Sequence, residues 1–397
     1  MKHILFITPL PPPVHGSAMV SQCIKDSELI RGEFDCDFVN LSTSRRMDEI
    51  GKGGAKKLLR FAGSFFLLFY KLLLHRYDLC YLAITCHGVG FLKDAPFVLL
   101  CKLFGRRIVI HQHNKGMNGC IDRWPYRWLI PYIYKHARVI LLSWHLYPDI
   151  AQAVKREQVM ICANGIRETV SGERSVLNGT DIKHSTLNSK HYTLNSKQEQ
   201  RDLTKPLTAH RSPLTVNLLF LSNLIPSKGV YVLLDACKML KDRGVAFQCN
   251  FVGGESKEMD RRVFGEAVKE RGLEGHVLYH GPKYGEEKEQ YWRMADVFVQ
   301  PTYEDCFPLT ILEAMQHGLP VVSTDEGAVP DMVADGENGF VCRRKDAEGL
   351  AQALERLLQD EALRHRMGAE GYRRYKEKFT LQCFEQRFTE ILREMNG

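Results

Sequence analysis

The chain has 397 residues, of which 44% are hydrophobic and 25% charged, so it is long enough for two ordinary globular domains. This composition excludes a wholly disordered chain, a collagen-like fibre and a small disulfide scaffold. The net charge of +7 is uneven, because residues 1–165 carry 22 Lys and Arg against 12 Asp and Glu, whereas the remainder carries 32 against 35. A basic front half and a mildly acidic back half indicate different partners for the two halves.

The first residues, MKHILFITPL, are apolar but run at once into Pro9 and Pro11–Pro13. Neither a hydrophobic core of signal-peptide length nor a small-residue cleavage site is present, so we expect a first buried strand. The 12 cysteines form no CxxC pair and no spaced Cys/His set. Scattered cysteines are typical of reduced thiols, which favours a cytoplasmic protein without a metal site.

Short runs rich in Val, Ile, Leu and Phe alternate with helix-length segments along the chain. Such runs are typical of buried parallel strands, and the alternation predicts helices on both faces of each sheet. Eleven strands are too many for one such sheet, so we predict an α/β protein with two doubly wound, Rossmann-like domains. The runs are 4–8, 34–41, 79–83, 107–111, 139–142, 159–163, 216–222, 247–253, 277–280, 297–299 and 321–324.

The boundary between the two domains is marked by a polar stretch. Residues 168–213 lose the apolar periodicity and contain the near-repeat HSTLNSK (184–190) and HYTLNSK (191–197). This segment is too polar to bury a core and too long for an ordinary connection, so we predict a flexible linker. The predicted divisions are an N-terminal domain (1–167), the linker, a C-terminal domain (214–378), and a final helix (379–397) that packs back on the N-terminal domain.

Residues 55–77 form an apolar helical segment with Lys56, Lys57, Arg60, Lys71 and Arg76 near its ends. Its uninterrupted apolar part is about ten residues, short of the roughly 20 that span a bilayer. Two interpretations remain: a helix in the surface of an anionic membrane, or a core helix with solvated basic ends. The basic front half favours peripheral contact with the inner face of the cell membrane.

The densest chemical pattern lies at residues 301–322. A strand is followed by a loop and by Pro308 near the first turn of a helix, where the missing amide hydrogen of proline costs nothing. The free amides of Leu309 and Thr310 then face any anion at this helix end, such as a diphosphate. Asp305 and Glu313 flank the same position, and carboxylates suit vicinal hydroxyls, so a sugar nucleotide fits: Glu313 for the ribose and Asp305 for the transferred sugar.

A second strand, 216–222, ends in the loop Ser222–Gly229, which opens a further helix. Lys228 in this loop would meet a diphosphate as a point charge.

Together these segments resemble the retaining glycosyltransferases of the GT-B fold, family 4 type, most closely over 216–345. The family's Lys-Gly loop end matches Lys228 and Gly229, and its Phe-Pro-Leu and Glu-Ala match Phe307, Pro308, Leu309, Glu313 and Ala314. The family's Arg is replaced by Asn223, and the first of its two acids is filled by Asp305, with Glu304 one residue early. In the front half the resemblance covers the loop with Gly16 and the strand end that carries the family's active-site histidine. We favour His113 over His111 for this histidine, because alternation along the strand buries His111. In the back half the resemblance also covers Gly253.

The resemblance implies a retaining transfer of a sugar from a nucleoside diphosphate sugar, with UDP or GDP as carrier, to a hydroxyl of a glycan or lipid-linked acceptor in polysaccharide assembly. Lys228, Asp305, Glu313 and His113 would be catalytic. No metal cofactor is expected, because protein groups neutralise the departing diphosphate. The donor would be bound by Gly16, Asn223, Gly253, Phe307, Pro308, Leu309, Thr310 and Glu313.

Three other interpretations are kept. Asn223 and Asp305 allow a non-catalytic protein that binds sugar nucleotides or glycans. An epimerase on the same fold is disfavoured by the spacing of Asp305 and Glu313. Nucleic-acid binding is disfavoured because the positive charge is dispersed and lacks interleaved aromatic residues.

Overall fold

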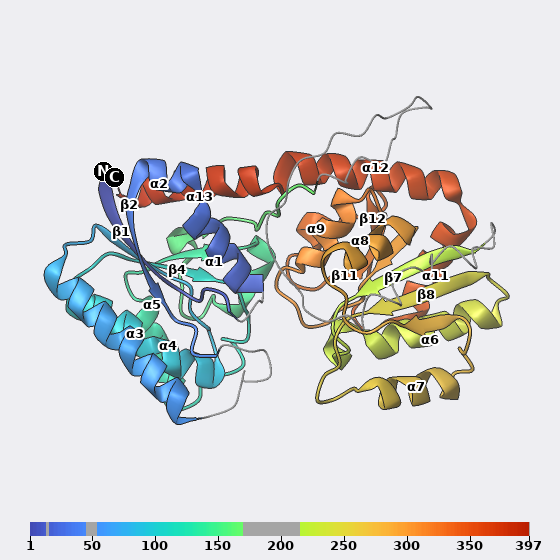
Figure 1. The fold of residues 1–397 in the computed structure, drawn as a ribbon, viewed down its shortest axis with the longest axis horizontal. Coiled ribbons are helices and arrows are strands. Elements are labelled where there is room, and N and C mark those ends of the chain that lie inside the picture. The colour runs from blue at the N-terminus through green and yellow to red at the C-terminus, as the bar shows by residue number, and fades with distance from the viewer. Residues whose placement is uncertain (13–15, 45–53, 170–214, 397) are drawn as a thin grey trace, which may run out of the picture.

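Two parallel sheets of six strands, each with helices on both faces, lie at opposite ends of the molecule (Figure 1). The computed structural model describes residues 1–12, 16–44, 54–169 and 215–396. The eleven predicted strands are all present, which confirms the α/β class and the doubly wound sheets. The twelfth, β12 (Gly339–Cys342), was not predicted: its run of three apolar residues is as short as that of β10, but it begins at a glycine and is followed at once by Arg343 and Arg344.

The N-terminal sheet has the strand order β2-β1-β3-β4-β5-β6. The chain therefore reverses its winding direction between β1 and β3, and the carboxyl ends of these strands border a crevice where ligands bind in such sheets. The residues after β1, β3 and β4 reach that edge. The strands are β1 (Lys2–Thr8), β2 (Phe34–Asn40), β3 (Leu79–Leu82), β4 (Ile108–Gln112), β5 (Arg138–Leu141) and β6 (Val159–Ile161).

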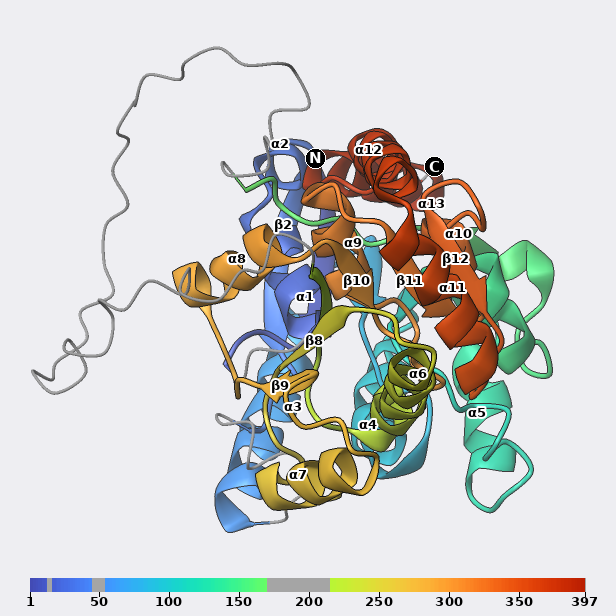
Figure 2. The same cartoon turned by 90° about the vertical axis from the view of Figure 1, so that its right-hand side faces the viewer.

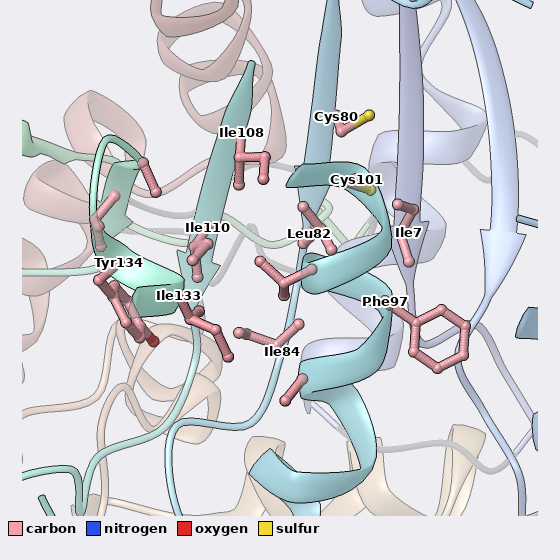
Figure 3. Close-up of a cluster of buried hydrophobic side chains, with 14 of the residues drawn as sticks. Ile7, Cys80, Leu82, Ile84, Phe97, Cys101, Ile108, Ile110, Ile133 and Tyr134 are labelled. Atoms are coloured by element: carbon pink, nitrogen blue, oxygen red, sulfur yellow. The ribbon is translucent and has the colours of Figure 1, made fainter. Parts of the chain in front are cut away.

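One face of this sheet is covered by α3, α4 and α5. Figure 3 shows Phe97 and Cys101 of α4 in the same cluster as the strand residues Ile7 and Leu82, and all four are almost completely buried. The helices of the domain are α1 (Gly16–Asp26), α2 (Glu28–Glu33), α3 (Ala55–Leu74), α4 (Gly88–Leu103) and α5 (Tyr126–Tyr134), with the short 3-10 helices η2 (Trp144–Asp149) and η3 (Arg156–Gln158).

The C-terminal sheet has the order β12-β11-β10-β7-β8-β9, so its winding reverses between β7 and β10. The two loops singled out in the sequence follow these two strands, and the topology therefore brings them together. The strands are β7 (Val216–Leu221), β8 (Phe247–Val252), β9 (Val277–Tyr279), β10 (Val297–Val299), β11 (Val321–Thr324) and β12. The helices are η6 (Pro226–Lys228), α6 (Val230–Asp242), α7 (Arg261–Glu270), α8 (Gly285–Met294), α9 (Leu309–Gln316), α10 (Val329–Met332), α11 (Ala347–Gln359) and α12 (Glu361–Lys378).

The last helix, α13 (Leu381–Asn396), follows α12 along one side of the molecule and returns to the N-terminal domain (Figure 1). Phe388 is fully buried there and meets the Tyr81 ring edge-on at 5.4 Å. Burying one such side chain contributes about 1.5–3 kcal/mol, so α13 fastens the two domains to each other. Gly165 permits the crossing, because a Cβ at this position would lie 2.2 Å from the Thr380 carbonyl oxygen.

Figure 2 views the molecule from the side of the C-terminal domain. Most of the predicted linker, residues 170–213, lies outside the described residues. Among the residues that are described, no helix is long and apolar enough to cross a membrane.

Candidate functional site

A cavity of about 390 Å³ lies between the two domains, at the carboxyl ends of both sheets. Its walls come from both halves of the chain, which places the two sets of sequence motifs opposite each other. Six of the predicted site residues line it: Gly16, His113, Lys228, Asp305, Phe307 and Leu309. Five do not: Asn223, Gly253, Pro308, Thr310 and Glu313.

Lys228 and Asp305 form an ion pair at the floor of this cavity. The Lys228 ammonium lies 2.6 Å from Asp305 Oδ2 and also donates to the Glu304 carbonyl oxygen at 3.1 Å. The other carboxylate oxygen, Oδ1, accepts the Cys306 amide at 2.8 Å. Both oxygens of Asp305 are therefore engaged, and the charge of Lys228 is held at the cavity wall.

Helix α9 points its N-terminus at the cavity, because Phe307 and Leu309 on either side of Pro308 line it. The first amides of a helix have no acceptor inside it, so those of Leu309 and Thr310 can serve an anion. The Thr310 hydroxyl donates to Gln300 Oε1 at 2.6 Å, which ties the first turn to the end of β10. Thr310 can therefore offer an anion its amide, while its side chain has a structural task.

Glu313 lies one turn further along α9 and is paired with a lysine. Lys288 of α8 places its ammonium 2.9 Å from Glu313 Oε1 and 2.7 Å from Oε2. This ion pair was not predicted, since Lys288 lies 25 residues from Glu313 in the chain. Asp305 lines the cavity and Glu313 does not, so the two acids hold different positions around α9.

Asn223 and Gly253 stabilise the conformation of the loops that follow β7 and β8. The Asn223 side chain accepts the Gly254 amide at 2.9 Å. A Cβ at Gly253 would lie 2.0 Å from the Ser222 carbonyl oxygen, so only glycine lets the loops after β7 and β8 approach this closely. The position that the resemblance assigns to an arginine is thus occupied by a residue that fastens two loops.

His111 and His113 follow one another on β4 and the residues after it, with ring centroids 4.0 Å apart. His111 is fully buried beside the Tyr81 hydroxyl, 2.8 Å from its Nδ1. Burial, aided by His113, holds the pKa of His111 well below its usual value, so this ring is neutral. His113 lines the cleft cavity, whereas His111 is not among the residues that line it.

A second cavity of about 950 Å³ opens in the N-terminal domain and shares Ser17, His113 and Asn114 with the first. Its walls include Leu58 and Phe61 of α3. His113 thus stands where the two cavities meet. Among the described residues, no group of three or more His, Cys, Asp or Glu lies close enough to hold a metal ion.

Two charged residues of the site were missed by the sequence reasoning. Lys115 lines the cleft cavity from the N-terminal domain, two residues after His113. It forms an ion pair with Glu326 of the C-terminal domain, whose side chain is 1% exposed. The spacing after His113 was the only signal for Lys115, and nothing local distinguished Glu326.

Residues 213–374 match the model of the family described as "Glycosyl transferases group 1". The chain is 31% identical over 153 residues to the amylovoran biosynthesis glycosyltransferase AmsK of Erwinia amylovora, covering 37% of each chain. It is 31% identical over 161 residues to the putative colanic acid biosynthesis glycosyltransferase WcaL of Escherichia coli, covering 39% of this chain and 38% of the relative. The chain therefore spans less than two fifths of these relatives.

The fold extends over nearly the whole chain. The crystal structure of Anabaena Alr3699/HepE in complex with UDP superimposes with a TM-score of 0.69 at 16% identity, covering 99% of this chain and all of the other. The arrangement of two facing parallel-sheet domains is the GT-B fold, as the resemblance predicts.

Proposed function

Because residues 213–374 match the model of the group 1 glycosyl transferases, we propose that the chain is a hexosyltransferase that moves a sugar from a nucleoside diphosphate sugar to a hydroxyl of a glycan or lipid-linked acceptor. The transfer retains the anomeric configuration and serves cell-surface polysaccharide assembly. The observation that carries this proposal is the cleft cavity, on which Lys228, the N-terminus of α9 and His113 converge from two domains.

The donor diphosphate would lie against Lys228 and the first amides of α9. Negative charge grows on the diphosphate as its bond to the sugar breaks, so fixed positive groups at that position lower the barrier. Lys228 and the helix N-terminus supply them from the protein, and the proposal therefore needs no metal. Glu313 would accept the ribose hydroxyls, exchanging Lys288 for the ligand. UDP or GDP is the proposed carrier; the related fold of HepE was crystallised with UDP and with UDP-glucose.

Retention follows from substitution on one face of the sugar. The acceptor oxygen forms a bond to the anomeric carbon while the bond from that carbon to the diphosphate oxygen breaks, and the acceptor proton passes to the departing diphosphate. Asp305 is engaged by Lys228 and the Cys306 amide, which disfavours it as a covalent nucleophile. His113, at the junction of the two cavities, would orient the acceptor or the donor sugar.

The larger cavity would receive the acceptor. It meets the donor cavity at His113 and is bordered by apolar side chains of α3 together with Lys57, Lys93 and Asp94, whose carboxylate lies 3.2 Å from the Lys93 ammonium. Apolar walls beside the Lys57 cation suit an acceptor that combines a sugar, a negative group and a hydrocarbon chain. This composition supports a lipid-linked acceptor over a free glycan.

The outer surface of the same domain supports peripheral contact with an anionic membrane through residues 55–77. Residues 55–135 carry 13 Lys and Arg against three Asp and Glu. Tyr132 of α5 adjoins α4 through Lys102, whose ammonium lies 5.1 Å from its ring centroid. Large apolar side chains are exposed on α3 and beyond it: Leu58, Leu59, Phe66, Tyr70, Leu73, Leu74, Leu103, Trp124, Trp128 and Tyr132. Exposed aromatic and apolar residues among basic ones are typical of proteins that lie on membranes.

Lys71 takes no part in this proposed membrane contact. Its ammonium lies 2.6 Å from Asp37 Oδ1 of β2, which holds α3 on the sheet. At the start of α3 the proposal assigns the membrane contact to Lys56, Lys57 and Arg60, of which Arg60 also donates to the Thr43 carbonyl oxygen at 2.8 Å. Replacing all three by Gln should weaken binding to phosphatidylglycerol-containing vesicles, whereas the matched change of Lys238, Arg262 and Lys269 on the C-terminal domain should not. Equal binding by both variants would contradict the membrane contact.

The first experiment is a thermal-shift panel of UDP, GDP, ADP and dTDP and their sugars, on the wild type and on Glu313→Ala. If the nucleotides of one base raise the melting temperature of the wild type but not that of Glu313→Ala, the result would support the donor site. The alternative, a non-catalytic binding protein, rests on Asn223 and Asp305. Hydrolysis or transfer of the bound donor by the wild type would dismiss it, and binding without turnover of any donor would favour it.

A further inference from the structure

Lys115 reaches across the cleft from one domain to the other. It follows β4 of the N-terminal domain, and its ammonium is paired with the buried carboxylate of Glu326 after β11. Glu326 has two further partners in its own domain. Arg344 Nη1 lies 3.1 Å from Oε2, and the amide of Asp305 donates to Oε1 at 3.1 Å.

Lys115 and Lys228 are paired with two carboxylates, those of Glu326 and Asp305, that are linked by a hydrogen bond from the Asp305 amide. Lys228 is paired with the Asp305 side chain, and the amide of that same residue donates to Glu326, which holds Lys115. Both lysines line the cleft cavity, one from each domain. Among the described residues that line this cavity, they are the only Lys or Arg side chains.

The donor site is otherwise short of positive charge. A bound diphosphate ester carries two negative charges, and a free diphosphate leaving group carries more, whereas Lys228 supplies one positive charge. Asn223, where the resemblance places an arginine, is neutral and directs its side-chain oxygen at the Gly254 amide. A cation from the opposite wall can make up this deficit.

We propose that Lys115 supplies the second cation to the departing diphosphate. This inference rests on the proposed glycosyl transfer. In the structure the ammonium is held by Glu326; with donor bound, it donates to a diphosphate oxygen from the acceptor-side domain. The exchange is feasible because Glu326 keeps Arg344 and the Asp305 amide when Lys115 leaves, so its buried charge is not left unpaired.

The exchange also links catalysis to the joining of the domains. Lys115 belongs to the acceptor-side domain and Lys228 to the donor-side domain, so both charges face one diphosphate only when the cleft is closed. Donor activation would then require the same closed arrangement that brings the acceptor side up to the sugar.

The test compares a diphosphate ligand with the same ligand lacking phosphate. By isothermal titration calorimetry, Lys115→Met should weaken binding of whichever nucleoside diphosphate the wild type binds by about tenfold or more, the effect of one charge-assisted hydrogen bond. Binding of the parent nucleoside should stay within twofold, roughly the scatter expected between unrelated variants. In transfer assays kcat should fall more than KM rises, because the charge on the leaving group is largest in the transition state.

Glu326→Gln separates this role from a structural clasp. It removes the resting partner of Lys115 but still accepts the Asp305 amide, so the diphosphate should bind at least as tightly as to the wild type. If Lys115 only clasps the domains, Glu326→Gln and Lys115→Met should lose affinity equally, and for the nucleoside as much as for the diphosphate; that result overturns the proposal. A wild type that binds no nucleoside diphosphate would instead refute the proposed function.

Discussion

Replacing Lys228 by alanine tests the donor site most directly. Lys228 and Asp305 are 23% and 17% exposed and their charged atoms are 2.6 Å apart, so solvent screens them only in part. Without Lys228 the diphosphate loses a charge-assisted hydrogen bond, which is worth about 1.5–3 kcal/mol, and binding should weaken by about 10–150-fold. Asp305 would also face the diphosphate without its cation and repel it.

The assay is calorimetric titration with the nucleoside diphosphate that the wild type binds. The double variant Lys228→Ala/Asp305→Ala should bind more tightly than Lys228→Ala alone, because it removes the repelling carboxylate. The matched control is Lys238→Ala, whose pair with Asp242 is about half exposed on α6 and should leave binding unchanged. If Lys228→Ala binds within threefold of the wild type, roughly 0.7 kcal/mol, the diphosphate does not lie against Lys228 and the reasoning is wrong.

Three further outcomes are expected. Glu313→Ala should weaken the nucleoside and its diphosphate alike, by about tenfold for one lost ionic hydrogen bond, in the same titrations; a loss confined to the diphosphate would contradict a ribose contact. Burial holds the pKa of His111 below its usual value, so the unfolded chain takes up a proton that the folded chain does not. The free energy of unfolding should therefore fall as the pH drops below about 6.5, by at most about 1.4 kcal/mol per pH unit. In urea titrations at pH 7.5 and 5.5, His111→Gln should lose less of this free energy between the two pH values than the wild type, and an equal loss would reject the assignment. Gly229→Ala should lower the free energy of unfolding in urea by about 2 kcal/mol more than Gly244→Ala does. Both glycines have a positive φ, but only at Gly229 would a Cβ lie 2.1 Å from the Pro301 carbonyl oxygen. Equal losses of unfolding free energy in the two variants would show that the clash relaxes.

The structure brings together residues that the sequence could only propose separately. Two loops about 75 residues apart meet because the winding of the C-terminal sheet reverses between β7 and β10, so Lys228 and Asp305 share one edge. The parallel strands and their order of appearance were readable, since each buried run has a local apolar signature. β12 was missed although its apolar run is as long as that of β10, because its place beside β11 depends on pairing rather than on composition.

For the candidate site, too, the sequence predicted local features and missed contacts between distant segments. Sequence patterns identified the lysine and the helix start that face the cavity, because both follow strands and carry recognisable chemistry. They did not find Lys288 beside Glu313, nor Glu326 beneath Lys115, because each of these pairs joins separate helices or separate domains. Such contacts depend on how elements dock, which no local pattern records.

By itself the sequence determined the class of fold, the strands and the loops that carry polar groups, because periodicity and loop chemistry act over a few residues at a time. Tertiary structure alone decided which charges meet. In the folded protein the Asn223 side chain accepts the Gly254 amide, and Lys71 pairs with Asp37 rather than lying in the predicted basic surface. Lys115 pairs with Glu326 across the cleft. The physical reason is that ion pairs and cavity walls form between surfaces that approach only after both domains have folded and docked.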